Sequence, residues 1–299
     1  MASKEQELEW IEQPGGWEGD NENQDEAEPK KSIENLNDND NDNEVGNDEE
    51  GFGGFDLFSE KDPELTFPFE VPLAGGKTVK LRLEGFTLDS DETAQSTGVT
   101  LWQAAPRLAR YLSTNTDLVV GKRVLELGAG LGLCGMVAHH LGAETVVLTD
   151  ADTITLQKMR SNLETNCARS NATQSIGCRQ LIWNNISQME GCGAFDTILG
   201  ADVIYTIESL DPLFDTVAFF LQEGALGGTR SFVLSRYTKY GNISDETVLD
   251  AARARNLVYT RPSEGIFVFR QGKNDGEEEP WHTAKTKQRE KLDTPMYSY

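Results

Sequence analysis

The chain has 299 residues, enough for one or two domains, and its 27 basic and 50 acidic residues give a formal net charge of −23 at pH 7. Most of the acidic excess precedes Asp62, no Lys- or Arg-rich stripe follows it, and no apolar run reaches the ~18 residues of a membrane span, so neither nucleic-acid nor membrane binding is expected. With three histidines and no Cys-x-x-Cys pair, the sequence offers almost no material for a metal site, and none is expected.

The N-terminal residues 1–62 crowd acidic side chains among Asn, Gln and Gly. Such a segment cannot bury enough apolar surface to offset its chain entropy, so a disordered acidic tail is predicted. A single domain is predicted over residues 63–272, and residues 273–299, which turn polar again, are predicted to form a flexible C-terminal tail. Apolar and polar residues alternate over 65–73 and again over 78–83, which predicts a β-hairpin at the start of this domain.

The stretch 124–133, Val-Leu-Glu-Leu-Gly-Ala-Gly-Leu-Gly-Leu, is the centre of the chain. Its first four residues predict a buried strand, Gly128, Gly130 and Gly132 form a turn, and an apolar helix is predicted over 131–141. Glycines let a ligand approach the backbone closely, and the helix start offers unpaired N–H groups, which is typical of a nucleotide-cofactor site. A dinucleotide fingerprint needs its third glycine one residue later, so the spacing disfavours NAD.

Strands and helices alternate after the turn. A second apolar strand, 144–149, ends in Asp150, an acid about 20 residues past the turn that can accept hydrogen bonds from a ribose diol. Further patterns predict helices over 154–166, 211–221 and 244–255 and strands over 176–183, 195–200, 230–235, 257–260 and 265–270. The alternation predicts an α/β fold with a seven-stranded, mostly parallel, Rossmann-like sheet, and the last two strands predict an antiparallel hairpin at its edge.

Four stretches carry a resemblance to a known family: GVTLWQAA at 98–105, the glycine turn at 126–132, LIW at 181–183, and FDTILGADVIY at 195–205. Together they resemble the seven-β-strand, class I S-adenosylmethionine-dependent protein-lysine methyltransferases, which act on chaperones, translation elongation factors and related proteins. The glycine turn is shared by the whole superfamily. The Asp-x-x-Tyr motif within the last stretch is much more specific.

The resemblance implies S-adenosyl-L-methionine as the cofactor, held by Trp102, Glu126, Gly128, Ala129, Gly130, Gly132, Asp150, Trp183 and Ala201. Trp102 is expected near the methionine end, Glu126 below the turn near the amino group, and Trp183 beside the adenine. Asp202 and Tyr205 are the expected catalytic residues, because an acid can steer the substrate's ammonium group and a tyrosine can line the lysine channel. Two alternatives remain open: Trp102 and Trp183 could be core packing residues, and Glu126 and Asp202 could cap backbone N–H groups.

The resemblance implies a monomeric enzyme that methylates a lysine side chain of a protein substrate, such as a chaperone or an elongation factor. Two alternatives are a methyltransferase-fold adaptor without catalysis and an enzyme that methylates an arginine or histidine side chain. The cysteines form no Cys-x-x-Cys pair and the sequence starts without a secretory segment. We therefore expect the protein in the cytoplasm and also in the nucleus.

Overall fold

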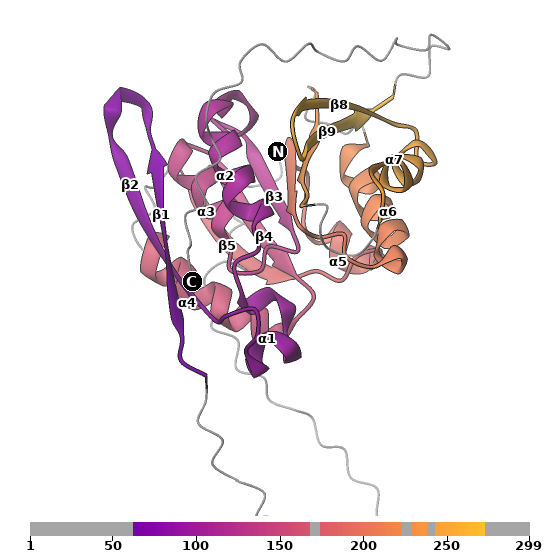
Figure 1. Ribbon diagram of the computed structural model, residues 1–299. Coiled ribbons are helices and arrows are strands. Elements are labelled where there is room, and N and C mark those ends of the chain that lie inside the picture. Colours follow the sequence, from indigo (N-terminus) through magenta and orange to yellow (C-terminus); the bar gives the residue numbers. More distant parts are fainter. Residues whose placement is uncertain (1–61, 168–173, 223–228, 238–242, 273–299) are drawn as a thin grey trace, which may run out of the picture. The chain divides into compact units, whose positions relative to one another are not determined.

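The computed structural model describes residues 62–167, 174–222, 229–237 and 243–272 (Figure 1). Apart from Asp62, the two predicted tails lie outside these ranges. The predicted hairpin is confirmed: β1 (Leu65–Pro72) pairs with β2 (Thr78–Gly85) in a separate antiparallel sheet. Its alternate residues are buried against the core, as expected for a strand with one solvated face.

The core is a seven-stranded sheet with the order β5-β4-β3-β6-β7-β9-β8. Its strands are β3 (Arg123–Leu127), β4 (Thr145–Asp150), β5 (Ser175–Gln180), β6 (Thr197–Ala201), β7 (Ser231–Ser235), β8 (Leu257–Ser263) and β9 (Ile266–Gln271). Strands β5, β4, β3, β6 and β7 pair in parallel, whereas β9 runs antiparallel to both of its neighbours. The last strand within the described ranges therefore lies between β7 and β8, and this mixed sheet confirms the predicted fold.

Helices cover both faces of the sheet (Figure 1). They are α1 (Asp91–Gln95), α2 (Ala104–Thr114), α3 (Leu133–Leu141), α4 (Thr153–Cys167), α5 (Ile186–Glu190), α6 (Leu210–Leu221) and α7 (Asp245–Arg253), with short 3-10 turns η1 (Ala74–Gly76), η2 (Thr97–Val99), η3 (Thr116–Leu118) and η4 (Ile207–Ser209). Val124 of β3 packs in an apolar cluster with α2, α3, α4 and the hairpin, whereas Leu125 and Leu127 pack on the opposite face with α5, α6 and α7. This alternation follows from the two-residue period of a strand.

The sheet topology fixes where a ligand can bind. From β3 the chain builds β4 and β5 on one side and then returns to build β6 and β7 on the other. In open α/β sheets, ligands bind outside the carboxyl ends of the strands at such a switch point. The glycine turn follows β3, Asp150 is the last residue of β4 and Asp202 follows β6, so the predicted site residues gather at this edge.

Some predicted boundaries were wrong. The helix after the glycine turn begins at Leu133 rather than at Leu131, because Gly132 has a φ of 88° and cannot belong to a right-handed helix. The strand predicted to reach Trp183 ends at Gln180, and the five-residue helices α1 and α5 were not predicted. No helix within the described ranges is long and apolar enough to cross a bilayer.

Candidate active site

The turn between β3 and α3 requires glycine at three positions. Gly128, Gly130 and Gly132 have φ values of 59°, 53° and 88°, in the left-handed region that L-residues rarely adopt. A Cβ atom at Gly128 would lie 2.8 Å from Cγ1 of Val203, and one at Gly132 would lie 2.8 Å from Cδ2 of Leu148. The turn is therefore tightly packed against Val203 and Leu148, while residues 128–130 remain partly exposed.

Asp150 is the last residue of β4 and lies beside this turn. Its Oδ2 accepts a hydrogen bond from the backbone N–H of Gly130 at 3.2 Å, and its Oδ1 accepts one from the N–H of Asp152 at 3.1 Å. Burial raises the pKa of Asp150, and the N–H groups of Asp152 and Gly130 oppose this effect. Each carboxylate oxygen keeps a second lone pair, so both can accept a further hydrogen bond from a ligand hydroxyl.

Glu126 lies under the turn with only 2% of its surface exposed. Its Oε2 accepts a hydrogen bond of 2.6 Å from the backbone N–H of Gly135, in the first turn of α3. This contact satisfies one of the unpaired N–H groups at the helix start. The capping alternative matches this geometry, and the expected contact with a cofactor amino group stays a prediction.

The burial of Glu126 predicts a pH effect on stability. Burial raises its pKa from 4.5 to about 8, although the N–H of Gly135 opposes the shift. Between these values the folded chain holds a proton that the unfolded chain has released, so stability is highest below the unfolded pKa and declines as pH rises through the folded pKa.

We therefore expect the free energy of unfolding to fall more steeply between about pH 5 and about pH 8 in the wild type than in Glu126→Gln, by a difference on the order of a few kcal/mol. Glutamine keeps an oxygen for the Gly135 N–H but has no charge to desolvate. Urea denaturation at several pH values measures the difference. Parallel stability curves for the two proteins would show that Glu126 does not titrate in this range.

Asp202 follows β6 and joins three segments of the chain. Its φ of 52° is left-handed, a conformation that Asp tolerates better than most residues. Its N–H donates to the carbonyl of Ser235, at the end of β7, over 2.9 Å. Its carboxylate accepts the N–H of Ala104, at the start of α2, at 2.9 Å on Oδ2, and the N–H of Tyr237 at 2.7 Å on Oδ1. Asp202 thus has the contacts of a capping residue, and its predicted steering role stays a prediction.

Two arginines surround the Asp202 carboxylate. Burial raises the pKa of Asp202, whereas the backbone N–H groups of Ala104 and Tyr237 and the charges of Arg107 and Arg236 oppose the rise. Arg107 donates to the carbonyl of Arg236 at 3.0 Å, and its guanidinium lies 5.4 Å from the ring centroid of Tyr237. No local pattern in the sequence indicated that these arginines belong to the site.

Aromatic side chains border the same edge of the sheet. Tyr205 is 53% exposed, although Val203 and Ile204 of the same motif are each only 4% exposed. Trp183 is half-buried, and its Cζ2 lies 3.5 Å from the position that a Cβ of Gly128 would occupy. Trp183 and Val203 therefore meet over Gly128. The two buried residues of the Asp-x-x-Tyr motif anchor the segment, and Tyr205 is left accessible at its end.

The remaining expected residues lie close to these. Trp102 precedes α2 and donates from Nε1 to the carbonyl of Thr97 at 2.8 Å. Ala129 donates its N–H to the carbonyl of Thr149 at 2.8 Å, and Ala201 is the half-buried last residue of β6. The structure thus gathers the predicted set at one edge of the sheet, while the individual roles stay predictions.

One residue of the site was quoted in the resemblance without a role. The carbonyl oxygen of Gly98 lies 3.2 Å from the position that a Cβ of Gly130 would occupy. A Cβ at Gly98 itself would lie 2.3 Å from Oγ1 of Thr155 in α4. Only glycine therefore lets this segment pass between the turn and α4. The sequence feature that could have identified Gly98 as a site residue is its position at the start of the stretch 98–105.

The accessible groups of this edge suit an adenosine-bearing cofactor. The half-exposed backbone at residues 128–130 can bind polar atoms of a ligand. The Asp150 carboxylate can accept hydrogen bonds from a ribose diol, and Trp183 offers an aromatic surface for a base. Within the described ranges, no group of three or more His, Cys, Asp and Glu residues is arranged to hold a metal ion.

Comparisons with known proteins identify the family of this chain. Residues 83–229 match a family model described as lysine methyltransferase. The chain is 31% identical over 183 residues to protein N-lysine methyltransferase METTL21A of Mus musculus, covering 60% of this chain and 79% of that protein. It is 28% identical over 174 residues to the calmodulin-lysine N-methyltransferase of Arabidopsis thaliana, covering 55% and 57%. A solved magnesium protoporphyrin IX methyltransferase from Synechocystis with bound SAH aligns with a TM-score of 0.43 at 13% identity, covering 56% of this chain and 83% of that chain.

Proposed function

Because this chain belongs to the lysine methyltransferase family and transfers methyl groups from S-adenosylmethionine to lysine side chains of proteins, we propose that Asp202 and Tyr205 guide the substrate lysine. The observation that supports this proposal most is the position of the Asp202 carboxylate. It comes just after β6, the strand that pairs with β3, and the glycine turn follows β3 at the switch point of the sheet. The exposed Tyr205 follows three residues later.

The glycine turn, Asp150, Trp183 and Ala201 would hold S-adenosylmethionine, which when bound would supply an electrophilic methyl group on a positively charged sulfur. A lysine arrives mostly as an ammonium, because its reference pKa is about 10.4. Asp202 attracts this ammonium and orients the nitrogen, and partial desolvation in the cleft favours loss of the proton. The ring of Tyr205 limits the directions from which the lysine can enter. Most of the rate then comes from holding nitrogen and methyl group in line.

The relatives of this chain favour lysine as the acceptor over arginine or histidine. Both relatives described above are named as lysine methyltransferases. An adaptor that had lost catalysis would have no need to retain the left-handed glycines, Asp150 and the Asp-x-x-Tyr motif together. The adaptor and the arginine or histidine enzyme therefore have no supporting observation.

Incubation of the purified chain with a cell extract and methyl-labelled S-adenosylmethionine tests the proposal. We expect one or a few labelled protein bands, and mass spectrometry should place the methyl group on a lysine nitrogen. Label on arginine or histidine would contradict lysine specificity. Binding of the cofactor in calorimetry without any labelled band would favour the adaptor.

We extend the proposal to the identity of the partner and to assembly. The protein substrate is a chaperone, a translation elongation factor or another lysine-bearing protein, which the family resemblance supports. The enzyme is proposed to act as a monomer in the cytoplasm and also in the nucleus. Light scattering of the purified chain and identification of the labelled protein test these statements separately.

A further inference from the structure

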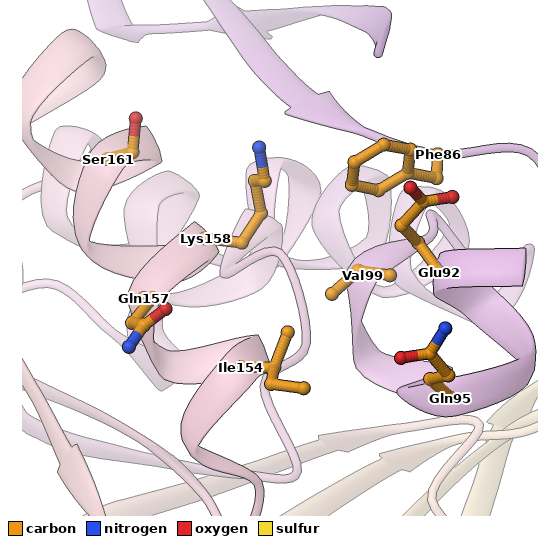
Figure 2. A pocket seen from close by; sticks show the side chains of 8 residues that line it. All are labelled: Phe86, Glu92, Gln95, Val99, Ile154, Gln157, Lys158 and Ser161. Atoms are coloured by element: carbon orange, nitrogen blue, oxygen red, sulfur yellow. The ribbon is translucent and has the colours of Figure 1, made fainter. Parts of the chain in front are cut away.

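A surface groove lies between α1 and α4, next to the cofactor turn (Figure 2). It has a volume of about 260 Å³ and is lined by Phe86, Glu92, Gln95, Val99, Ile154, Gln157, Lys158 and Ser161. Phe86 follows β2, Glu92 and Gln95 belong to α1, Val99 ends η2, and the other four residues belong to α4. The groove therefore combines apolar side chains with carboxylate, amide, hydroxyl and ammonium groups.

Glu92 carries an unsatisfied acceptor in this groove. Its Oε2 is buried, and among the described residues it has no hydrogen-bond partner. Figure 2 shows the carboxylate beside the ring of Phe86. A carboxylate oxygen that has lost water without gaining a donor is unfavourable, and rotation of the Glu92 side chain toward a donor supplied by a ligand would remove the cost.

The charges around the groove favour a cation. Segments 62–64, 86–99 and 154–161 contain five acidic residues, Asp62, Glu64, Asp89, Asp91 and Glu92, against two basic ones, Lys158 and Arg160. The ammonium of Lys158 is paired with Glu64 at 2.6 Å and lies 5.2 Å from the ring centroid of Phe86. Lys158 is thus neutralised by a partner outside the lining, which leaves the Glu92 charge uncompensated.

The groove and the cofactor turn share a wall. The carbonyl of Gly98 lies against Gly130, and the next residue, Val99, lines the groove. Ser96 and Thr155 fix this wall to α4 through a buried hydrogen bond of 2.8 Å between their hydroxyl oxygens. The groove therefore lies beside the cofactor turn, separated from it by residues 98 and 99.

We propose that the groove binds an arginine side chain of the protein substrate, separate from the lysine that is methylated. This inference rests on the proposed function. The guanidinium donates to Glu92 and to the side-chain oxygens of Gln95 and Gln157, and the aliphatic stem packs on Val99 and Ile154. Arginine suits the site because its planar group presents several donors and also packs flat on apolar and aromatic surfaces.

A direct binding experiment uses the peptide acetyl-Gly-Gly-Arg-Gly-Gly-amide and its citrulline analogue, which has the same shape without the charge. Binding is followed by NMR at ¹³C-labelled methyl groups of Ile154 and Val99 in the full chain loaded with S-adenosylhomocysteine. We expect the arginine peptide alone to shift both methyl signals, and Glu92→Gln to weaken the response about tenfold. No shift, or equal shifts with citrulline or with Glu92→Gln, would overturn the proposal.

Kinetics provide the second measurement, with the protein labelled in a cell extract as the substrate. Glu92→Gln should raise KM for that protein about tenfold and leave kcat and cofactor affinity unchanged. The matched control is Glu70→Gln on β1, because its carboxylate is 65% exposed and lies in a surface pair with Lys80. An unchanged KM in Glu92→Gln would contradict the groove. Absence of any labelled protein with the wild type would instead contradict the proposed function.

Discussion

Replacing Asp202 by asparagine is expected to lower kcat for methyl transfer about a hundredfold, while the affinity for S-adenosylmethionine stays close to that of the wild type. Asparagine has the same shape and also tolerates the left-handed φ of 52°. It loses the charge that attracts and orients the substrate ammonium, and misplacement of the reacting nitrogen by about 1 Å can cost that factor. Alanine is a poorer test, because it would leave the N–H groups of both Ala104 and Tyr237 without their acceptor.

The structural cost of this substitution needs a matched control. The amide of asparagine can accept only one of the two backbone N–H groups, so stability should fall by about 1–3 kcal/mol. Asp196→Asn provides the comparison, because Asp196 directly precedes the same strand and accepts the N–H of Arg123 on Oδ2 at 2.9 Å. Asp202→Asn should lose more stability in urea denaturation than Asp196→Asn, whose amide oxygen can still accept the Arg123 N–H, and only Asp202→Asn should lose kcat. Equal turnover in the two variants would reduce Asp202 to a capping residue.

Asp150→Ala is expected to weaken cofactor binding by about 1–3 kcal/mol, the usual cost of removing a hydrogen bond to a charged group, which raises Kd roughly 5- to 150-fold. The carboxylate would bind the ribose diol, and it also holds the N–H of Gly130 in the turn. The chemical step should survive at saturating cofactor, because Asp150 does not approach the substrate.

Calorimetry with S-adenosylhomocysteine measures this loss, and Asp152→Ala is its control. Asp152 lies two residues further along the same loop, and its Oδ1 accepts the N–H of Ile154 at 2.8 Å. It therefore carries the same charge as Asp150 and likewise accepts a backbone N–H, although only one where Asp150 accepts two. Similar affinities for both variants and the wild type would remove the ribose role from Asp150.

The sequence predicted the sheet and its edge well because the relevant signals are local. Buried strands such as β3 and β4 are short apolar runs between polar turns. Such a run buries the side chains on both of its faces only in a sheet that is covered on both sides. The five-residue helices α1 and α5 escaped because they are too short for a helical period. Their caps, Ser90 and Asn185, were visible, but a single capping residue also fits a turn.

The site was predicted as a set of residues but not as a set of contacts. That Glu126 meets the N–H of Gly135 depends on how α3 leaves the glycine turn, and that Asp202 meets Ala104 depends on a strand and a helix far apart in sequence. Arg107 and Arg236 lie in segments without a motif, so only the folded chain brings them to Asp202. Long-range geometry of this kind has no local sequence signal.

The position of β9 also has a consequence for biosynthesis. Phe267 and Phe269 of this strand, only 2% and 0% exposed, fill the core between β7 and β8, which were both made earlier. Until residue 271 has left the ribosome, β7 and β8 of the nascent chain lack the strand that pairs with both of them. Unpaired strand edges can pair with other chains. The described sheet can therefore close only after β9 has been translated.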